Sequence, residues 1–132
     1  MQQSLKQGYP VHQFAQPTKR YCQQLDLVND AALIEQYKHW HNSANIWPEI
    51  PAGMRAVGIL EMDIYLCQNH AFMIVEVPVD FDWDTAFERL AALDRQAEWE
   101  DFVSKFQCST PGAASNEKWQ LMERIFSFFS CN

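Results

Sequence analysis

Basic residues are scarce in this 132-residue sequence. Ten Lys and Arg face 17 Asp and Glu, which gives a formal net charge of −7, and no Lys/Arg-rich run occurs anywhere along the chain. Binding to nucleic acid or to an anionic membrane depends on clustered positive charge. The scarcity of such charge excludes both as expected partners.

Metal-binding cysteine patterns and long apolar runs are also missing. The four cysteines form no C-x-x-C pair and have no His at metal-ligand spacing; they are Cys22, Cys67, Cys108 and Cys131. We therefore expect reduced thiols and no metal site. No segment approaches the roughly 20 apolar residues that span a bilayer, and the N-terminus has no apolar stretch of signal-peptide length. A cytoplasmic location is expected.

Hydrophobic residues are plentiful, at 48% of the chain, with five Trp and nine Phe. Such a composition excludes intrinsic disorder, and the length suits one domain with one core. Residues 1–17 are rich in Gln, contain Gly8, Pro10 and Pro17, and show no periodicity. We interpret them as an N-terminal extension to a single domain over residues 18–132.

The hydrophobic periodicity predicts an α+β fold. Alternation predicts strands at 19–27 and 58–66. An apolar run predicts a strand at 71–77, joined to the second strand by a hairpin turn, and a final strand is expected at 118–129. Helices are expected from a cap at Asn29 or Asp30 to about Asn42, after a cap at Asp82 or Asp84, and again after Asp94. The text between Asn42 and the second strand, NSANIWPEIPAGM, predicts a packed loop.

This order, β-α-β-β-α-β with the second helix split in two, is the ferredoxin-like arrangement: an antiparallel sheet with helices on one face. The other face of the sheet then needs a cover, because an exposed apolar face is an association site. A homodimer of the dimeric α/β barrel type is expected.

Tyr37 and His41 are the candidate catalytic residues. Four residues apart on the first helix, they share one face and can point into one cavity. An imidazole with a pKa near 6.5 gives or accepts a proton at neutral pH, which is what opening a sugar ring requires. The alternative is that both belong to an ordinary buried stripe. His39 lies on the opposite side of the helix and does not form a chelating pair with His41.

The other titratable candidates are weaker. His12 in the N-terminal extension and His70 in the turn are expected to be solvated. Glu61 and Asp63 resemble a catalytic carboxylate pair, but their alternation with apolar residues places them on the wet or dimer-facing side of the sheet.

The run EQYKHWHNSANIWPEIP, residues 35–51, resembles the L-rhamnose mutarotase family. That family has a Tyr and a His four apart, then His-Asn and Ile-Trp-Pro-Glu, and the matching residues here are Tyr37, His41, Asn42, Ile46, Trp47, Pro48 and Glu49. The hairpin text DIYLCQNHAFMIVEV and the aromatic helix around Trp99 are also similar, so that the resemblance covers residues 19–128.

The resemblance implies a cofactor-free, dimeric, ferredoxin-like isomerase that interconverts the α and β anomers of a 6-deoxy-L-sugar. The family's proton donor corresponds to His41 and its substrate-contacting tyrosine to Tyr37. One residue of its tandem Trp pair corresponds to Trp99, which would cover an apolar sugar face. By the same resemblance, Asn42 and Trp47 are expected to bind substrate.

Three departures from the family pattern concern the sugar pocket. Two residues are inserted within 43–45, Met62 stands where the family has a substrate-contacting Tyr, and Glu98 replaces the first Trp of the tandem pair. The sugar can therefore differ from L-rhamnose, and L-fucose is the obvious neighbour. Glu98 either enters the pocket with Met62 or is a surface helix residue.

Two other functions remain open on the sequence alone. One is a ferredoxin-like oxygenase or haem-binding protein, since this fold hosts several chemistries. The other is a sugar-binding module without turnover. The sequence also leaves open which sugar is preferred and which ring nitrogen of His41 carries the proton.

Overall fold

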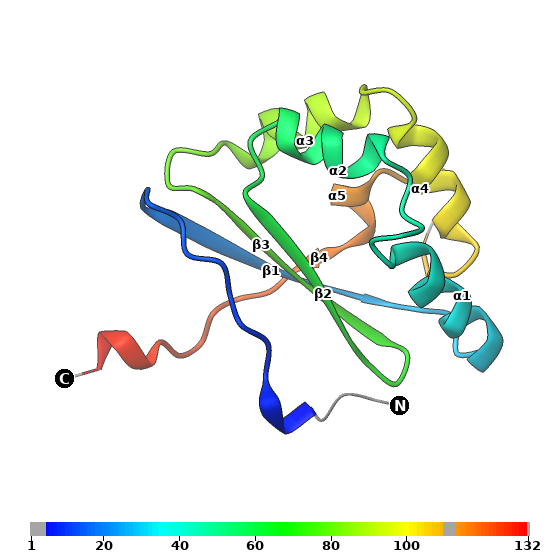
Figure 1. Cartoon of the computed structure of the whole chain (residues 1–132), viewed down its shortest axis with the longest axis horizontal. Coiled ribbons are helices and arrows are strands. Elements are labelled where there is room, and N and C mark those ends of the chain that lie inside the picture. Colours follow the sequence, from blue (N-terminus) through cyan, green and yellow to red (C-terminus); the bar gives the residue numbers. More distant parts are fainter. Residues whose placement is uncertain (1–4, 110–112, 132) are drawn as a thin grey trace.

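The computed structural model describes residues 5–109 and 113–131 and contains a four-stranded antiparallel sheet (Figure 1). The strands are β1 (Thr18–Asp26), β2 (Glu61–Cys67), β3 (His70–Pro78) and β4 (Gln120–Leu121), in the order β2-β3-β1-β4. The β2–β3 hairpin turns through Gln68 and Asn69, with Gln68 in the left-handed region at φ 57°. The predicted α+β fold with one antiparallel sheet is confirmed.

The α-helices all lie on one face of the sheet (Figure 1). They are α1 (Ala31–His41), α2 (Glu49–Ala56), α3 (Trp83–Ala91), α4 (Gln96–Ser104) and α5 (Ser115–Lys118). Of the alternative caps, Asp30 serves α1, because its carboxylate accepts a hydrogen bond from Leu33 N at 3.0 Å. Asp82 serves α3 in the same way, through Thr85 N at 3.0 Å. Each carboxylate satisfies a backbone donor left free in the first helical turn.

The core lies between this helical layer and the inner face of the sheet. Alternate residues of β3, Ala71, Met73, Val75 and Val77, are all buried there. Leu25 of β1 is paired with Ala71, so the two inner faces continue across the sheet. Buried and outward-facing side chains thus alternate along β3, as expected for a strand with one face packed against the core.

The prediction of a loop between α1 and β2 was wrong in part, because this segment contains helix α2. Pro48 lies at the N-cap and Pro51 in the first turn, where the missing N–H of proline costs no intrahelical hydrogen bond. A Cβ on Gly53 would lie 3.3 Å from the Leu90 Cδ1 atom, so the glycine lets α2 approach α3 closely. Proline and glycine here permit the helix instead of breaking it.

The predicted final strand at 118–129 was also wrong in extent. Lys118 ends α5, and β4 contains two residues. The Met122 N–H still donates to the Cys22 carbonyl at 2.8 Å. Beyond it the chain leaves the sheet (Figure 1), and the large side chains of Ile125, Phe126, Phe128 and Phe129 are exposed. Nothing within the described chain packs against them to hold this segment in the sheet.

The outer face of the sheet is partly covered by the N-terminal segment. The rings of Tyr9 and Tyr65 meet edge to face at 5.8 Å between centroids. Glu61 and Asp63 lie on this face, in a hollow shared with His12. The two carboxylates are therefore on the side of the sheet away from the helices.

The four cysteines are free thiols. In the part of the chain that the structure describes, no helix is both long and apolar enough to cross a membrane. Within the same residues, no three His, Cys, Asp or Glu side chains gather in a way that could hold a metal ion.

Candidate active site

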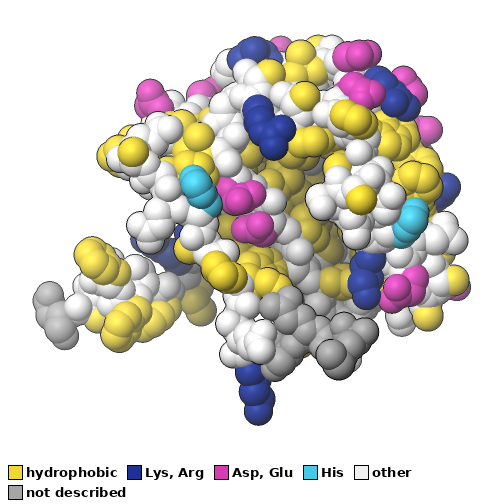
Figure 2. Space-filling view, viewed as in Figure 1, with side chains coloured by type: hydrophobic (Ala, Val, Ile, Leu, Met, Phe, Trp, Pro, Cys, Tyr) yellow, Lys and Arg dark blue, Asp and Glu magenta, His cyan; other side chains and the backbone are white. Residues whose placement is uncertain are grey.

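A cavity of about 250 Å³ lies between the inner face of the sheet and the helices. Figure 2 shows a hollow lined mainly with hydrophobic side chains on the face where β2, α1 and α2 lie in Figure 1. Its apolar lining includes Met62, Ile64 and Trp99, and its polar lining consists of Tyr37, His41, Gln96, Glu100, Gln107 and Ser115. A small apolar cavity with a few convergent polar groups is typical of a small-molecule site.

His41 presents one defined nitrogen for chemistry. Its Nδ1 lies 2.7 Å from the backbone carbonyl oxygen of Tyr37. Because a carbonyl only accepts, Nδ1 carries the hydrogen, and in the neutral ring Nε2 carries the lone pair. Burial lowers the pKa of His41 below its ordinary value, against the opposing effect of this hydrogen bond. The ring is therefore neutral at pH 7, with Nε2 able to accept a proton.

Tyr37 lies against His41, with 4.0 Å between the two ring centroids. Burial raises the pKa of the Tyr37 phenol well above its ordinary value, although a hydrogen bond with Gln107 opposes the effect. The phenol is thus protonated at neutral pH and serves as a hydroxyl group.

Trp99 forms the other aromatic wall beside His41, at 5.3 Å between centroids. Trp47 does not line the cavity; it packs behind Trp99, with ring centroids 5.2 Å apart. The Arg95 guanidinium stacks on Trp47 at 4.1 Å, and its Nη1 donates to Glu49 Oε1 at 3.1 Å. That contact holds the pKa of the Glu49 carboxyl below its ordinary value. The Ile46-Trp47-Pro48-Glu49 segment therefore packs against Trp99 and holds its ring in place.

The structure brings together four of the residues expected to form the site: Tyr37, His41, Met62 and Trp99. The other three lie outside the cavity lining. Asn42 is exposed, and its Oδ1 accepts a hydrogen bond from Ala44 N at 2.8 Å. Glu98 is exposed and lies 3.6 Å from Arg95 Nη2. Trp47 supports Trp99, as described above.

A buried polar network at the α4–α5 side of the cavity was not predicted. Lys118 Nζ, on a side chain with no exposed surface, contacts Glu100 Oε1 at 3.0 Å and Gln107 Oε1 at 3.0 Å. Glu100 Oε2 accepts from Gln96 Nε2 at 2.7 Å. The network thus runs from Gln96 through Glu100 and Lys118 to Gln107, and all of its members except Lys118 line the cavity.

A family model described as L-rhamnose mutarotase matches residues 20–128 of the chain. The chain belongs to the L-rhamnose mutarotase family. It is 38% identical over 109 residues to an L-fucose mutarotase from Xanthomonas campestris pv. campestris, covering 83% of this chain and 87% of the relative. It is also 38% identical over 112 residues to a UPF0734 protein from Dictyostelium discoideum, covering 82% and 88%.

The fold of this mutarotase family member matches a solved relative. An L-rhamnose mutarotase from Formosa agariphila superposes with a TM-score of 0.63 at 20% identity, covering 83% of this chain and 98% of that one. The predicted family and the predicted enzyme class, an isomerase acting on carbohydrates, are confirmed.

The sequence does carry a signal for two residues of the polar network that was not predicted. Gln96 and Glu100 share a helical stripe with Trp99 and Val103, both of which are buried, and this spacing indicates that they face the interior.

Proposed function

We propose that this mutarotase family member interconverts the α and β anomers of a 6-deoxy-L-sugar, with His41 as the acid/base residue. The observation that carries the proposal is the fixed tautomer of His41, whose unprotonated Nε2 belongs to a ring lining the cavity. A neutral imidazole beside a bound sugar can take the proton of the anomeric hydroxyl without a cofactor. Tyr37 orients the substrate through its hydroxyl group.

The proposed reaction is balanced by one proton moving between two oxygens. Nε2 removes the proton from the anomeric hydroxyl, the C1–O5 bond breaks, and its electron pair goes to the ring oxygen O5. The imidazolium then gives its proton to O5, which leaves an open-chain aldehyde. One imidazole can serve both oxygens because both are bonded to C1. Rotation about C1–C2 and the reverse steps close the ring on the other face.

The substrate class follows from the apolar wall of the cavity. Trp99 can cover the apolar face of a pyranose, and Met62 and Ile64 can contact a C6 methyl group. Met62 offers no hydroxyl where the family has a tyrosine. This difference, with the similarity to a relative named L-fucose mutarotase, favours L-fucose beside L-rhamnose as a substrate.

Saturation-transfer NMR with L-rhamnose, L-fucose and D-galactose tests the proposal. We expect the exchange rate between the anomers of at least one 6-deoxy-L-sugar to rise in proportion to protein concentration. Binding without faster exchange would favour the non-catalytic module, and a haem absorption band on the purified protein would favour the oxygenase or haem protein. Unchanged exchange for all three sugars would contradict the proposed function.

We also propose that the protein is a homodimer of the dimeric α/β barrel type. The support is the segment after β4, in which Phe128 is 82% and Phe129 98% exposed, together with the outer face of the sheet, where Tyr65 is exposed. Exposed apolar surfaces of this kind are sites of association. A second copy would supply the missing cover for both.

The cytoplasmic location expected from the sequence stays a prediction.

The dimer is tested by light scattering. The full chain is expected to have about twice the 15.4 kDa mass of one copy, and a variant that ends at Met122 is expected to lose most of the dimer. A full chain that scatters as a monomer at micromolar concentration would contradict the dimer. A truncated variant that stays fully dimeric would place the interface elsewhere.

A further inference from the structure

Gln96 buries an amide oxygen that has no partner. The residue, at the start of α4, is 3% exposed, and its Nε2 donates to Glu100 Oε2 at 2.7 Å. Its Oε1 has no hydrogen-bond partner within residues 5–109 and 113–131. A buried polar atom without a partner is costly and needs a physical reason, such as a ligand that supplies the missing hydrogen.

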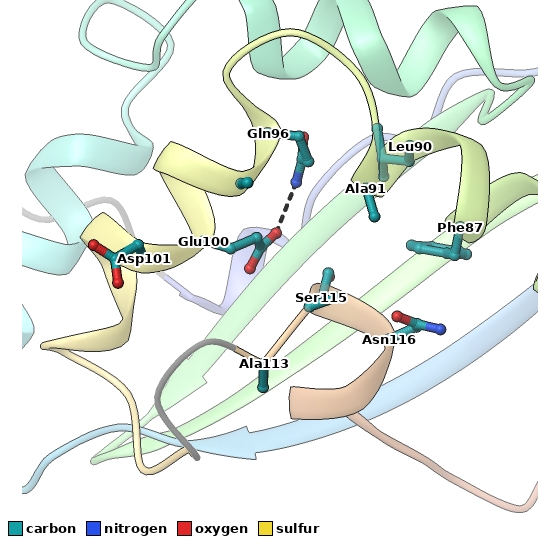
Figure 3. A pocket seen from close by; sticks show the side chains of 11 residues that line it. Phe87, Leu90, Ala91, Gln96, Glu100, Asp101, Ala113, Ser115 and Asn116 are labelled. Atoms are coloured by element: carbon teal, nitrogen blue, oxygen red, sulfur yellow. Dashed lines mark hydrogen bonds between the residues drawn. The ribbon is translucent and has the colours of Figure 1, made fainter.

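Gln96 lies beside the space that such a ligand would occupy. The cavity that His41 lines adjoins a second hollow of about 140 Å³ between α3, α4 and α5. Gln96 and Glu100 line both spaces. Figure 3 shows the two side chains of α4 reaching toward each other and toward α5, while Asp101 points away from them. The pair therefore stands at the boundary of the two spaces.

Glu100 adds two further acceptors to this boundary. Lys118 Nζ donates to Glu100 O at 2.7 Å and to Gln107 Oε1 at 3.0 Å, and it forms an ion pair with Glu100 Oε1 at 3.0 Å. Each carboxylate oxygen of Glu100 has one partner within the protein and keeps a free lone pair: Oε1 pairs with the Lys118 ammonium, and Oε2 accepts from Gln96. The boundary thus offers acceptors, whereas the lysine is engaged by three oxygens of the protein.

We propose that Gln96 Oε1 and the Glu100 carboxylate form an acceptor pair that binds two hydroxyl groups of the sugar and so determines which sugar the enzyme accepts. The inference rests on the proposed function and assigns its specificity to residues outside the Tyr-x-x-x-His signature. A neutral polyol supplies the hydrogens that these oxygens lack. A sugar acid or sugar phosphate brings more acceptors and is rejected.

Replacing Gln96 with methionine separates binding from folding. The variant Gln96→Met keeps the side-chain volume and removes both the unpartnered oxygen and the Nε2 hydrogen bond to Glu100. The first loss is stabilising and the second destabilising, so the melting temperature is expected to change by only a few degrees. The dissociation constant for the preferred sugar, measured by NMR titration, is expected to rise about tenfold. Gln36→Met, on the exposed side of α1, is the matched control and is expected to change neither quantity.

Monodeoxy analogues of the preferred sugar locate the contact. The wild type is expected to bind one analogue about tenfold more weakly than the parent sugar, and Gln96→Met is expected to bind the two equally. An unchanged dissociation constant in Gln96→Met, or a drop in melting temperature without a change in binding, would overturn the acceptor pair. Titration needs no turnover, so binding without anomer exchange would contradict only the proposed function. A wild type that binds none of the sugars would overturn both.

Discussion

Replacing His41 with alanine is expected to slow protein-catalysed anomer exchange by roughly 10²–10⁴-fold, the usual contribution of a general acid/base residue. The imidazole is held by its Nδ1 contact with the Tyr37 carbonyl, and Nε2 is the nitrogen left for the substrate. Alanine removes both the proton acceptor and the ring that lies between Tyr37 and Trp99. Saturation-transfer NMR at several protein concentrations measures the loss.

His39 provides the matched control on the same helix. It is exposed, it does not line the cavity, and its backbone carbonyl accepts a hydrogen bond from Asn45 Nδ2 at 3.0 Å whatever its side chain. His39→Ala should therefore exchange anomers at a rate close to that of the wild type. Equal losses in the two variants would point to damage of α1 and would contradict an acid/base role for His41.

The sequence predicted the parts of the molecule that depend on local spacing. Tyr37 and His41 are four apart on a helix, and the helical period brings their rings to 4.0 Å. The hairpin was predicted because an alternating segment and an apolar segment lie on the two sides of a short polar turn. In each case the contacts join residues that are neighbours along the chain or within one element.

The sequence failed where packing between distant elements decides the structure. Pro48 and Pro51 indicated a loop, but both lie where a helix tolerates proline, so α2 forms over the site. Glu100 and Lys118 are 18 residues apart in different elements, and nothing in their spacing indicates that they pair. Only the tertiary fold, which places the end of α5 beside α4, brings them together.

Trp47 shows how a sequence signature can mark a residue without fixing its role. The resemblance predicted that it binds substrate, and the structure places it between Trp99 and the Arg95 guanidinium. The signature is thus explained by a supporting stack of aromatic and cationic side chains, which holds Trp99 in the cavity wall. A short sequence signature cannot distinguish a side chain that contacts a ligand from one that holds its neighbour.

Replacing Lys118 with methionine is expected to destabilise the fold by about 3–5 kcal/mol, the usual cost of removing one partner of a buried ion pair. The Lys118 side chain has no exposed surface, and Glu100 is 13% exposed, so the remaining carboxylate cannot recover its hydration. For a domain of this length the loss corresponds to a melting temperature lower by about 10–20 °C. Calorimetry or circular dichroism measures the shift.

Two controls test whether the loss of stability in Lys118→Met comes from the burial of the ion pair: an exposed Lys–Glu pair and a double variant. Lys38 and Glu35 are 3.2 Å apart on the surface of α1, and Lys38→Met should cost less than about 0.5 kcal/mol because water screens that pair. Combining Lys118→Met with Glu100→Leu should restore much of the stability, since an apolar pair leaves no buried charge. Equal costs for Lys118→Met and Lys38→Met would contradict a buried pair. A stable double variant with weak sugar binding would show that this ion pair is maintained for the substrate and not for the fold.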